Sequence, residues 1–437
     1  MIVEPGLERE AFKMLLEKFL VHGNSNDEWN QARSKAWDRF STLGLPSKKD
    51  EVYRYIKLRH LFSQPFDIPP ESKLSAEQIA PYIQPECRES VLVFVNGDYC
   101  SELSNTTAIP AQISVSTLQD AVQTYGMFLN NHWNKSLKEE SDSFVALNGA
   151  LNHKGAFIYI PPKIVFPHPI QILNILDTDN RLCMIAPRLN VFVGAHAQVN
   201  FLFTQKNFSE KAYFVNQVIE MSLEENSKVY CSQILCDEHP SSWHLNALRA
   251  ILKRNAVLKA VSVTEGSMTV RSDYRIILAG ENAEALLNGL SMLRDKRESH
   301  TNIWIEHQAP HCRSFQLFKS VLDDFSRTSF EGKIMVRQAA QKTEAFQLNN
   351  NLILSDHAHA DSKPNLEIFA DDVKASHGAT IGQLDSEQLF YMKTRGFSQS
   401  AAMNLLVFGF CEQILEMLTV DSVKQTIAGK AKNYLME

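Results

Sequence analysis

One histidine, His377, has the surroundings of a binding group. It follows a strand-like, alternating run that begins at Pro364 and becomes acidic at Asp371 and Asp372, and Gly378 comes directly after it. Because a glycine has no Cβ, the backbone beside the imidazole can turn sharply or approach another chain closely. A neutral imidazole can bind a metal through one nitrogen while a neighbour orients the other. His377 is therefore the candidate metal ligand, and the alternative is a structural histidine hydrogen-bonded at a strand end.

A helix is predicted directly after this strand. The segment from Asp385 to Gly396 has an N-cap aspartate, apolar residues at helical spacing, basic residues in its last turn and a final glycine. A strand with one exposed histidine would thus lead straight into a capped helix. This arrangement is typical of a binding edge.

Other histidines and cysteines have spacings that can bind metals. His357 and His359 would point to one face of a strand, and Cys231 and Cys236 lie five residues apart beside His239. Neither group has a further convergent ligand. We interpret the first as an exposed turn and the second as small residues in a strand and the loop after it. Around Pro310 a third group, His307, His311 and Cys312, is interpreted as a turn that has a role in shape.

Composition excludes several classes of protein. The chain has 437 residues, of which 44% are apolar and 22% charged, and its net charge of −6 gives no reason to expect nucleic acid or an anionic membrane as a partner. No run approaches the roughly 18 apolar residues that a membrane span needs, and the acidic start of the chain does not read as a signal peptide. Seven cysteines without a C-x-x-C motif indicate a reducing compartment. We expect a cytoplasmic protein.

The chain divides into three regions that differ in predicted secondary structure. Residues 1–130 are predicted to be mainly helical, with helices over residues 8–20 and 26–40, and residues 384–437 are predicted to be helical again. Between them, residues 131–383 consist of short strands in which a turn followed by a small residue recurs, with the small residues at 197, 227, 256 and 283. Such a period predicts a β-solenoid whose coils stack on one another. An evenly spaced β-sandwich is the competing interpretation, and the scarcity of Asn-Gly and Asp-Gly hairpin turns favours the solenoid.

No nucleotide-binding motif is present. The pairs Gly332-Lys333 and Gly429-Lys430 lack the G-x-x-x-x-G-K-[ST] spacing, and there is no G-x-G-x-x-G, G-x-S-x-G or H-E-x-x-H. We expect that this chain does not hydrolyse ATP itself.

Several runs together resemble the SufB/SufD family, the scaffold subunits of the Suf iron–sulfur cluster assembly machinery. The resemblance covers nearly the whole chain and is densest from about Thr301 to Phe410. Tyr53 stands where the family usually has tryptophan. The matching runs are Gly44-Leu-Pro46, Lys49, Glu51, Tyr53-Arg-Tyr55, Glu306-His-Gln-Ala-Pro310, Lys319, Phe330-Glu-Gly-Lys333, Ala340-Gln-Lys-Thr343, Asn349-Asn-Asn-Leu352, Lys363-Pro364, Leu366-Glu-Ile368, Asp371-Asp-Val-Lys374, Ser376-His-Gly-Ala-Thr380, Gln388-Leu-Phe-Tyr391 and Arg395-Gly396.

The resemblance implies a mainly β fold, a right-handed parallel β-helix between N-terminal and C-terminal helical domains. It also implies a scaffold that pairs with a SufB-like subunit through the β-helix edge and docks a SufC-like ATPase through its C-terminal helices. A transient iron–sulfur cluster, shared with SufB and not held stably by this chain alone, would form near His377. Besides His377, the residues expected at the partner interface are Glu367, Phe369, Lys374, Ser376, Gly378, Thr380, Gln388, Phe390, Tyr391 and Arg395.

Departures within the matching runs distinguish the two subunit types. SufB-like chains carry acidic residues on both sides of the histidine, where this chain has Ser376 and Gly378, and Asn349 stands at the position of the essential SufB cysteine. Both features match the D-type subunit. Ala375 replaces a cysteine that is often present in D-type chains, so the resemblance implies an imidazole contribution from this chain and no thiolate there.

The sequence leaves two alternative functions open. The first is a β-solenoid enzyme, either a polysaccharide lyase using Asp371, Asp372 and Lys374 or an acyltransferase. The hexapeptide repeat of the latter is missing, and a secreted lyase fits the cysteine usage badly. The second is a purely structural homodimer in which the strand edge pairs with that of a second copy.

Overall fold

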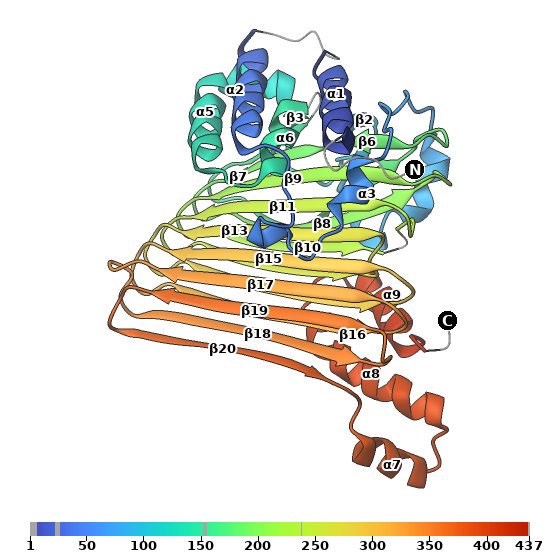
Figure 1. The fold of residues 1–437 in the computed structure, drawn as a ribbon. Helices are drawn as coiled ribbons and strands as arrows, with labels where there is room; N and C mark the ends of the chain where they lie inside the picture. The colour runs from blue at the N-terminus through green and yellow to red at the C-terminus, as the bar shows by residue number, and fades with distance from the viewer. Residues whose placement is uncertain (1–6, 22–26, 152–154, 237, 436–437) are drawn as a thin grey trace.

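The computed structural model describes residues 7–21, 27–151, 155–236 and 238–435. The N-terminal helices lie at one end of a long stack of strands, and the C-terminal helices lie along its side and project beyond its other end (Figure 1). The helices are α1 (Leu7–Val21), α2 (Asp27–Leu43), η1 (Glu51–Tyr53), α3 (Leu58–Phe62), α4 (Ala76–Ile79), η2 (Ala80–Tyr82), η3 (Pro85–Cys87), α5 (Leu118–Glu139), α6 (Ser143–Leu151), α7 (Ser386–Thr394), α8 (Gln399–Leu415) and α9 (Asp421–Lys432).

The strands follow one another from residue 91 to residue 382. They are β1 (Val91–Val95), β2 (Asp98–Asn105), β3 (Ser114–Thr117), β4 (Ala156–Ile160), β5 (Val165–Leu176), β6 (Cys183–Ile185), β7 (Arg188–Val193), β8 (Gln198–Asn207), β9 (Tyr213–Leu223), β10 (Lys228–Leu235), β11 (Trp243–Leu252), β12 (Val257–Thr264), β13 (Thr269–Leu278), β14 (Glu284–Leu293), β15 (Glu298–His307), β16 (Arg313–Leu322), β17 (Arg327–Val336), β18 (Thr343–Ile353), β19 (His359–Ile368) and β20 (Val373–Gly382). No helix in the described ranges is long and apolar enough to cross a membrane.

Two sheets run along the stack. One has the order β2-β1-β5-β8-β10-β12-β14-β16-β18-β20, and the other has the order β19-β17-β15-β13-β11-β9-β7-β4-β3, with β6 beside β9. From β8 and β9 onward each strand pairs in parallel and in register with the strand two further along the chain. Every coil therefore contributes one strand to each sheet, which confirms the β-solenoid. A sandwich of hairpins would have shown antiparallel pairs. The division into domains at residues 130 and 383 stays a prediction, because β1 and β2 also join the first sheet.

The predicted repeat marks one corner of each coil. The small residues at 197, 227, 256 and 283 are at most 1% exposed. Each follows a residue in the left-handed region: His196, Asn226, Asn255 and Asn282 have φ of 61°, 59°, 56° and 56°. Asparagine adopts this conformation at low cost. The backbone N–H of Asn226 donates to the carbonyl of Arg254 in the next coil at 2.9 Å, so the corners stack on one another.

Gly280 gives a test of this corner packing. An added Cβ would lie 2.1 Å from the backbone nitrogen of Arg254. We expect Gly280→Ala to lower the free energy of unfolding by about 1–3 kcal/mol, because backbone atoms would have to move. The control is Gly409→Ala in α8, where nothing lies within 4 Å and alanine favours the helix by up to about 1 kcal/mol. Chemical denaturation compares the two variants, and equal stabilities would contradict the packing.

Apolar side chains fill the solenoid and attach both sets of helices. The interior cluster extends from Leu92 to Phe330. At the C-terminal side, α8 and α9 cover the outer face of the first sheet through a cluster that includes Val261 and Val407. At the N-terminal end, α1, α3 and α6 pack on the second sheet in a cluster that includes Phe214. The N-terminal helices were predicted, as were α7, α8 and α9, and they are present near the expected boundaries.

Charged groups are also buried beneath the N-terminal region. Asp273 on β13 lies 2.5 Å from both the Arg249 and the Arg271 guanidinium groups. Arg271 also contacts Asp142 at 3.0 Å, and the Tyr53 hydroxyl donates to the same carboxylate at 2.6 Å. This network joins the second sheet to segments more than a hundred residues away in the chain.

Candidate functional site

His377 lies on the last strand of the first sheet. β20 pairs with β18, and no strand of the described chain lies on its other side. The same holds for β19, the last strand of the second sheet. The His377 side chain is exposed, and no described residue hydrogen-bonds its imidazole. The strand and the helix that follows it are thus as predicted, and the solenoid ends in an open edge (Figure 1).

Register shows which way His377 points. In a parallel sheet, residues in register share a face, and Gln316, Gln347 and His377 are in register on β16, β18 and β20. Gln347 is 2% exposed and faces the interior, because a Cβ added to Gly332 on the opposite sheet would come within 1.9 Å of its Nε2. That nitrogen donates to Gln316 Oε1 at 2.8 Å. His377 therefore ends a polar row that faces the inside of the solenoid, and it is exposed because no further coil covers it.

The structure brings the other predicted strand residues to the same edge. Lys374 lies 3.4 Å from Glu344, and the Thr380 hydroxyl donates to Asn350 Oδ1 at 3.0 Å. Their neighbours on this edge include Ser376, which is exposed, Gly378, which packs against Leu348, and Glu367, which lies 2.7 Å from Lys333. These residues all lie on β19 and β20, so the predicted strand contacts form one continuous edge.

Apolar side chains are also exposed at this edge. Phe369, in the turn between the last two strands, is 60% exposed, and Ile381 on β20 is 55% exposed. Phe369 was among the predicted contact residues and Ile381 was not. Alternate residues of a strand lie on the same face, so Ile381 lies on the same face of β20 as His377 and Ala379. This alternation in the sequence would have predicted Ile381 as a contact residue.

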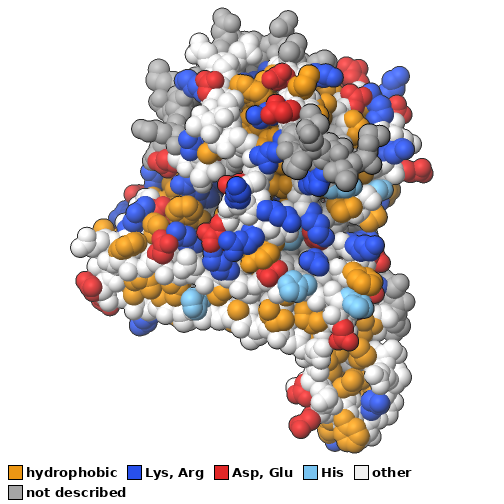
Figure 2. Space-filling model, in the orientation of Figure 1, with side chains coloured by type: hydrophobic (Ala, Val, Ile, Leu, Met, Phe, Trp, Pro, Cys, Tyr) orange, Lys and Arg blue, Asp and Glu red, His pale blue; other side chains and the backbone are white. Residues whose placement is uncertain are grey.

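Helix α7 carries the remaining predicted contact residues. Asp385 caps it by accepting from the backbone N–H of Glu387 at 2.8 Å, and the helix has no buried residue. Phe390 and Tyr391 are 68% and 56% exposed, and the Arg395 guanidinium lies over the Tyr391 ring. Figure 1 shows α7 extending beyond the end of the solenoid, and apolar side chains are visible on this projection in Figure 2. Predicted residue Gln388 lines a cavity of about 430 Å³ at the base of the projection, with Leu352, Gln383, Leu384, Asp385, Leu405, Leu406, Gly409 and Phe410.

The paired histidines have separate partners. His357 stacks on Phe325 with ring centroids 4.7 Å apart, and His359 Nε2 lies 3.4 Å from Asp361. His357 lies in an exposed turn, as predicted, and His359 is the first residue of β19. Within the described ranges, no three His, Cys, Asp or Glu residues are grouped closely enough to hold a metal ion.

The paired cysteines also have separate surroundings. Cys231 packs inside the solenoid, where burial raises the pKa of its thiol to about 12. Cys236 packs in the cluster beneath the C-terminal helices. Their interpretation as small residues of a strand and loop is confirmed.

The turn around Pro310 has the expected role in shape. His311 has φ of 61° and Cys312 is fully buried, so they continue the corner repeat. His307 is also fully buried, and its Nε2 lies 2.9 Å from the Ser314 hydroxyl. Burial lowers the pKa of His307 to about 4.

This buried imidazole predicts a loss of stability in acid. With a folded pKa of about 4 and an unfolded value of about 6.5, the unfolded state binds the proton first as the pH falls. The stability contributed by neutral His307 is present above pH 6.5, and about 3 kcal/mol of it is lost by pH 4. We expect His307→Gln to reduce the slope of unfolding free energy against pH in this window. The exposed control, His357→Gln, should keep the slope, and equal slopes for wild type and His307→Gln would contradict the assignment.

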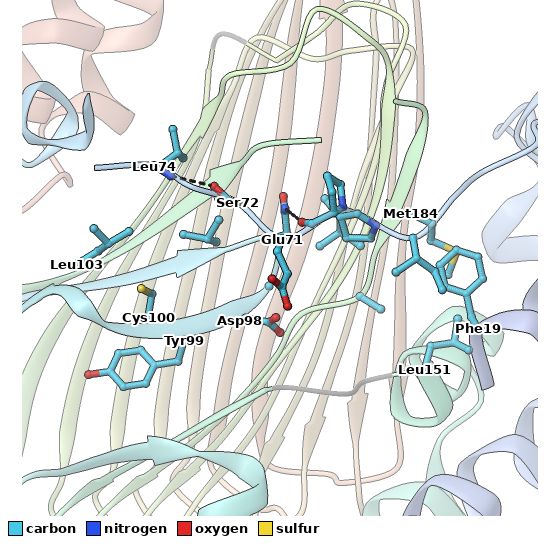
Figure 3. A pocket seen from close by; sticks show the side chains of 18 of the residues that line it. Phe19, Glu71, Ser72, Leu74, Asp98, Tyr99, Cys100, Leu103, Leu151 and Met184 are labelled. Atoms are coloured by element: carbon cyan, nitrogen blue, oxygen red, sulfur yellow. Dashed lines mark hydrogen bonds between the residues drawn. The ribbon is translucent and has the colours of Figure 1, made fainter. Parts of the chain in front are cut away.

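A cavity of about 630 Å³ lies at the opposite end of the solenoid from His377. It is lined by residues from α1, the segment before α4, β1, β2, α6 and β6. Figure 3 shows the Glu71 and Asp98 side chains directed into the same space, with Tyr99 and Cys100 on one side and Phe19 on the other. No local sequence pattern predicts this cavity, because its walls come from segments far apart in the chain.

Two family models cover nearly the whole chain. The model described as the SUF system FeS cluster assembly SufBD core domain matches residues 174–410, and the SufBD protein N-terminal region matches residues 15–172. The chain belongs to the SufB/SufD family. The core model includes β20, α7 and most of α8, so the open edge with His377 lies inside the part that defines the family.

Relatives in the SufB/SufD family cover most of the chain. An iron–sulfur cluster assembly SufBD family protein of Synechocystis is 30% identical over 95% of this chain and 93% of its own length. The iron–sulfur cluster assembly protein SufD of Escherichia coli is 30% identical over 89% of this chain and 88% of its own. SufB of Bacillus subtilis is 23% identical over 89% and 85%.

Other residues that match the SufB/SufD family stabilise the fold. The Lys363 ammonium contacts Glu51 of the N-terminal region and lies 3.3 Å from Glu331. The Lys319 ammonium donates to the carbonyl of Phe410 in α8 at 2.9 Å, and burial lowers the pKa of this lysine. These lysines connect the solenoid to the N-terminal segment and to the C-terminal helix, and the exposed Lys363 pair contributes little to stability because water screens it.

Proposed function

We propose that this chain is a SufD-like, non-ATPase scaffold subunit of the Suf iron–sulfur cluster assembly complex. It pairs with a SufB-like subunit through β19 and β20, docks a SufC-like ATPase through its C-terminal helices, and works in the cytoplasm. The nascent cluster forms at the paired edges near His377. The observation that carries the proposal is an open solenoid edge, in a SufB/SufD family chain, that holds an unpartnered imidazole.

The edge has the properties of a pairing surface. β19 and β20 are ten residues long, and each has backbone donors and acceptors on a side without a neighbouring strand in the described chain. Such an edge pairs with another strand unless it is covered or blocked. Exposed Phe369 and Ile381 add apolar area at the same place, and pairing would remove both from water.

His377 supplies a nitrogen ligand to an iron substrate. The imidazole is exposed at the open end of the solenoid and has no hydrogen-bond partner among the described residues. Burial raises the pKa of the thiols of Cys87, Cys231 and Cys411 to about 12. None of the seven cysteines lies on β19, β20 or α7, so thiolate ligands at this edge come from the SufB-like partner.

The C-terminal helices supply the docking surface for the ATPase. The exposed Phe390 and Tyr391 rings of α7 lie beside a cavity of about 430 Å³ that reaches the exposed Leu405 of α8. Aromatic anchors beside an apolar hollow are typical of protein interfaces. Movement of the docked ATPase would reach the cluster edge directly, because α7 follows β20 after three residues.

A self-paired homodimer is the second candidate. The same open edge, with Ile381 and Phe369 exposed, can be covered by a second copy of this chain when no SufB-like subunit is present. Membership of the SufB/SufD family gives no support to the lyase or acyltransferase alternatives.

Co-expression with SufB-like and SufC-like proteins tests the proposal. A tagged copy of the full chain is purified from cells that produce all three proteins, and the complex is weighed by native mass spectrometry. We expect a stable complex that contains all three. If the chain purifies alone or only as a homodimer in the presence of both partners, the scaffold assignment fails.

A further inference from the structure

A third cavity lies between the solenoid and the C-terminal helix α9. It has a volume of about 330 Å³ and is formed by the turn after β14, the residue after β12 and the end of α9. It is separate from the open edge and from the hollow beside α7, because it shares no residue with either. The residues that line it are Glu265, Met292, Arg294, Asp295, Arg297, Lys430 and Tyr434.

Two arginines in this cavity have unused donors. The guanidinium of Arg294 lies over the Tyr434 ring, 4.2 Å from its centroid, and its buried Nη2 has no hydrogen-bond partner among the described residues. The buried Arg297 Nε also has none in the described part of the chain, and Asp295 is 3.9 Å away, beyond hydrogen-bond distance. Buried donors of this kind normally have an acceptor.

The surroundings fix Arg294 and give it no ion pair among the described residues, whereas Arg297 lies 3.9 Å from the exposed Asp295 carboxylate. The Tyr434 hydroxyl donates to the carbonyl of Leu293 at 2.6 Å, so the ring that supports Arg294 is held against the solenoid. Lys430 is 2.9 Å from Glu265, which neutralises that pair and leaves Arg294 as a positive charge inside the cavity. A planar, stacked guanidinium is suited to bidentate hydrogen bonding to a carboxylate or phosphate.

We propose that this cavity binds a small free oxyanion, a metabolite that carries phosphate or carboxylate groups, through Arg294 and Arg297. The volume is in the range of small-molecule sites. Because the walls come from both the solenoid and α9, a bound anion would strengthen the attachment of the C-terminal helix. The proposal does not rest on the assembly function, since it uses no residue of the open edge.

Titration calorimetry with the purified full-length chain tests the site. The probes are inorganic phosphate and citrate, each at constant ionic strength with chloride as the balancing anion. We expect saturable one-site binding of at least one probe, weakened about tenfold or more in Arg294→Gln and in Arg297→Gln, a loss of about 1.4 kcal/mol.

Lys296→Gln is the matched control, because Lys296 is exposed in the same turn and does not line the cavity. It removes the same charge and should keep the affinity within about twofold. Arg297→Gln leaves the Arg294–Tyr434 stack intact, so it tests the site even if Arg294→Gln unfolds. No saturable binding by wild type, or equal weakening by Lys296→Gln and Arg297→Gln, would overturn the proposal.

Discussion

Replacing Asp273 with alanine is expected to lower the free energy of unfolding by about 3–5 kcal/mol, because it leaves two buried guanidinium groups without their shared carboxylate. Burial alone would raise the pKa of Asp273, but Arg271 and Arg249 lower it to about 2, so the carboxylate stays charged at neutral pH. All three side chains are at most a tenth exposed. Chemical denaturation followed by circular dichroism measures the loss.

An exposed ion pair provides the matched control. The Arg254 and Glu225 side chains lie 3.1 Å apart and are 55% and 50% exposed. Breaking this pair with Glu225→Ala should cost less than about 1 kcal/mol, because water screens the charges. If Asp273→Ala cost no more than Glu225→Ala, the buried network would not hold the N-terminal region on the solenoid.

Ile381→Lys is expected to weaken pairing of the open edge more than about 100-fold and to leave the chain folded. The side chain is 55% exposed on β20, so an isolated chain tolerates the lysine. When a partner strand covers the edge, an unpaired ammonium is buried there at a cost of about 3–5 kcal/mol. The dissociation constant of the pair with the SufB-like subunit, measured by calorimetry, gives the effect.

Val165→Lys separates edge pairing from a general effect of added charge. Val165 is 62% exposed and lies on β5, many coils away from the open end. We expect this variant to pair with unchanged affinity and both variants to have the thermal stability of wild type. Unchanged affinity in Ile381→Lys would place the partner surface elsewhere.

Local signals were enough to predict the main N-terminal and C-terminal helices and to favour a β-solenoid over a β-sandwich, and the family resemblance implied the same solenoid. The N-cap at Asp385, the small residues at corner positions and the helical stripe after residue 8 each depend on neighbours in sequence. The left-handed residues before the corners, such as Asn226 and Asn255, are visible in the sequence as well. Stacking of the coils follows from their repetition.

Contacts between distant segments could not be predicted in this way. That His377 faces the interior depends on its register with Gln347, which is 30 residues earlier and whose side chain meets the opposite sheet at Gly332. The hydrogen bond from the Tyr53 hydroxyl to the Asp142 carboxylate joins residues that are 89 positions apart in the sequence. No local pattern contains such pairs, because they arise only when coils and helices pack.

Cluster assembly by the reconstituted complex with His377→Ala tests the central claim most directly. Native mass spectrometry first shows that the variant complex forms. The complex is then supplied with iron, sulfide and a reductant, and the visible absorbance of the iron–sulfur cluster is followed. His168→Ala, on an exposed histidine of β5 many coils away from the open edge, is the control and should assemble clusters normally. We expect His377→Ala to lower the amount of cluster formed about tenfold or more. Normal assembly by an intact His377→Ala complex would contradict the account.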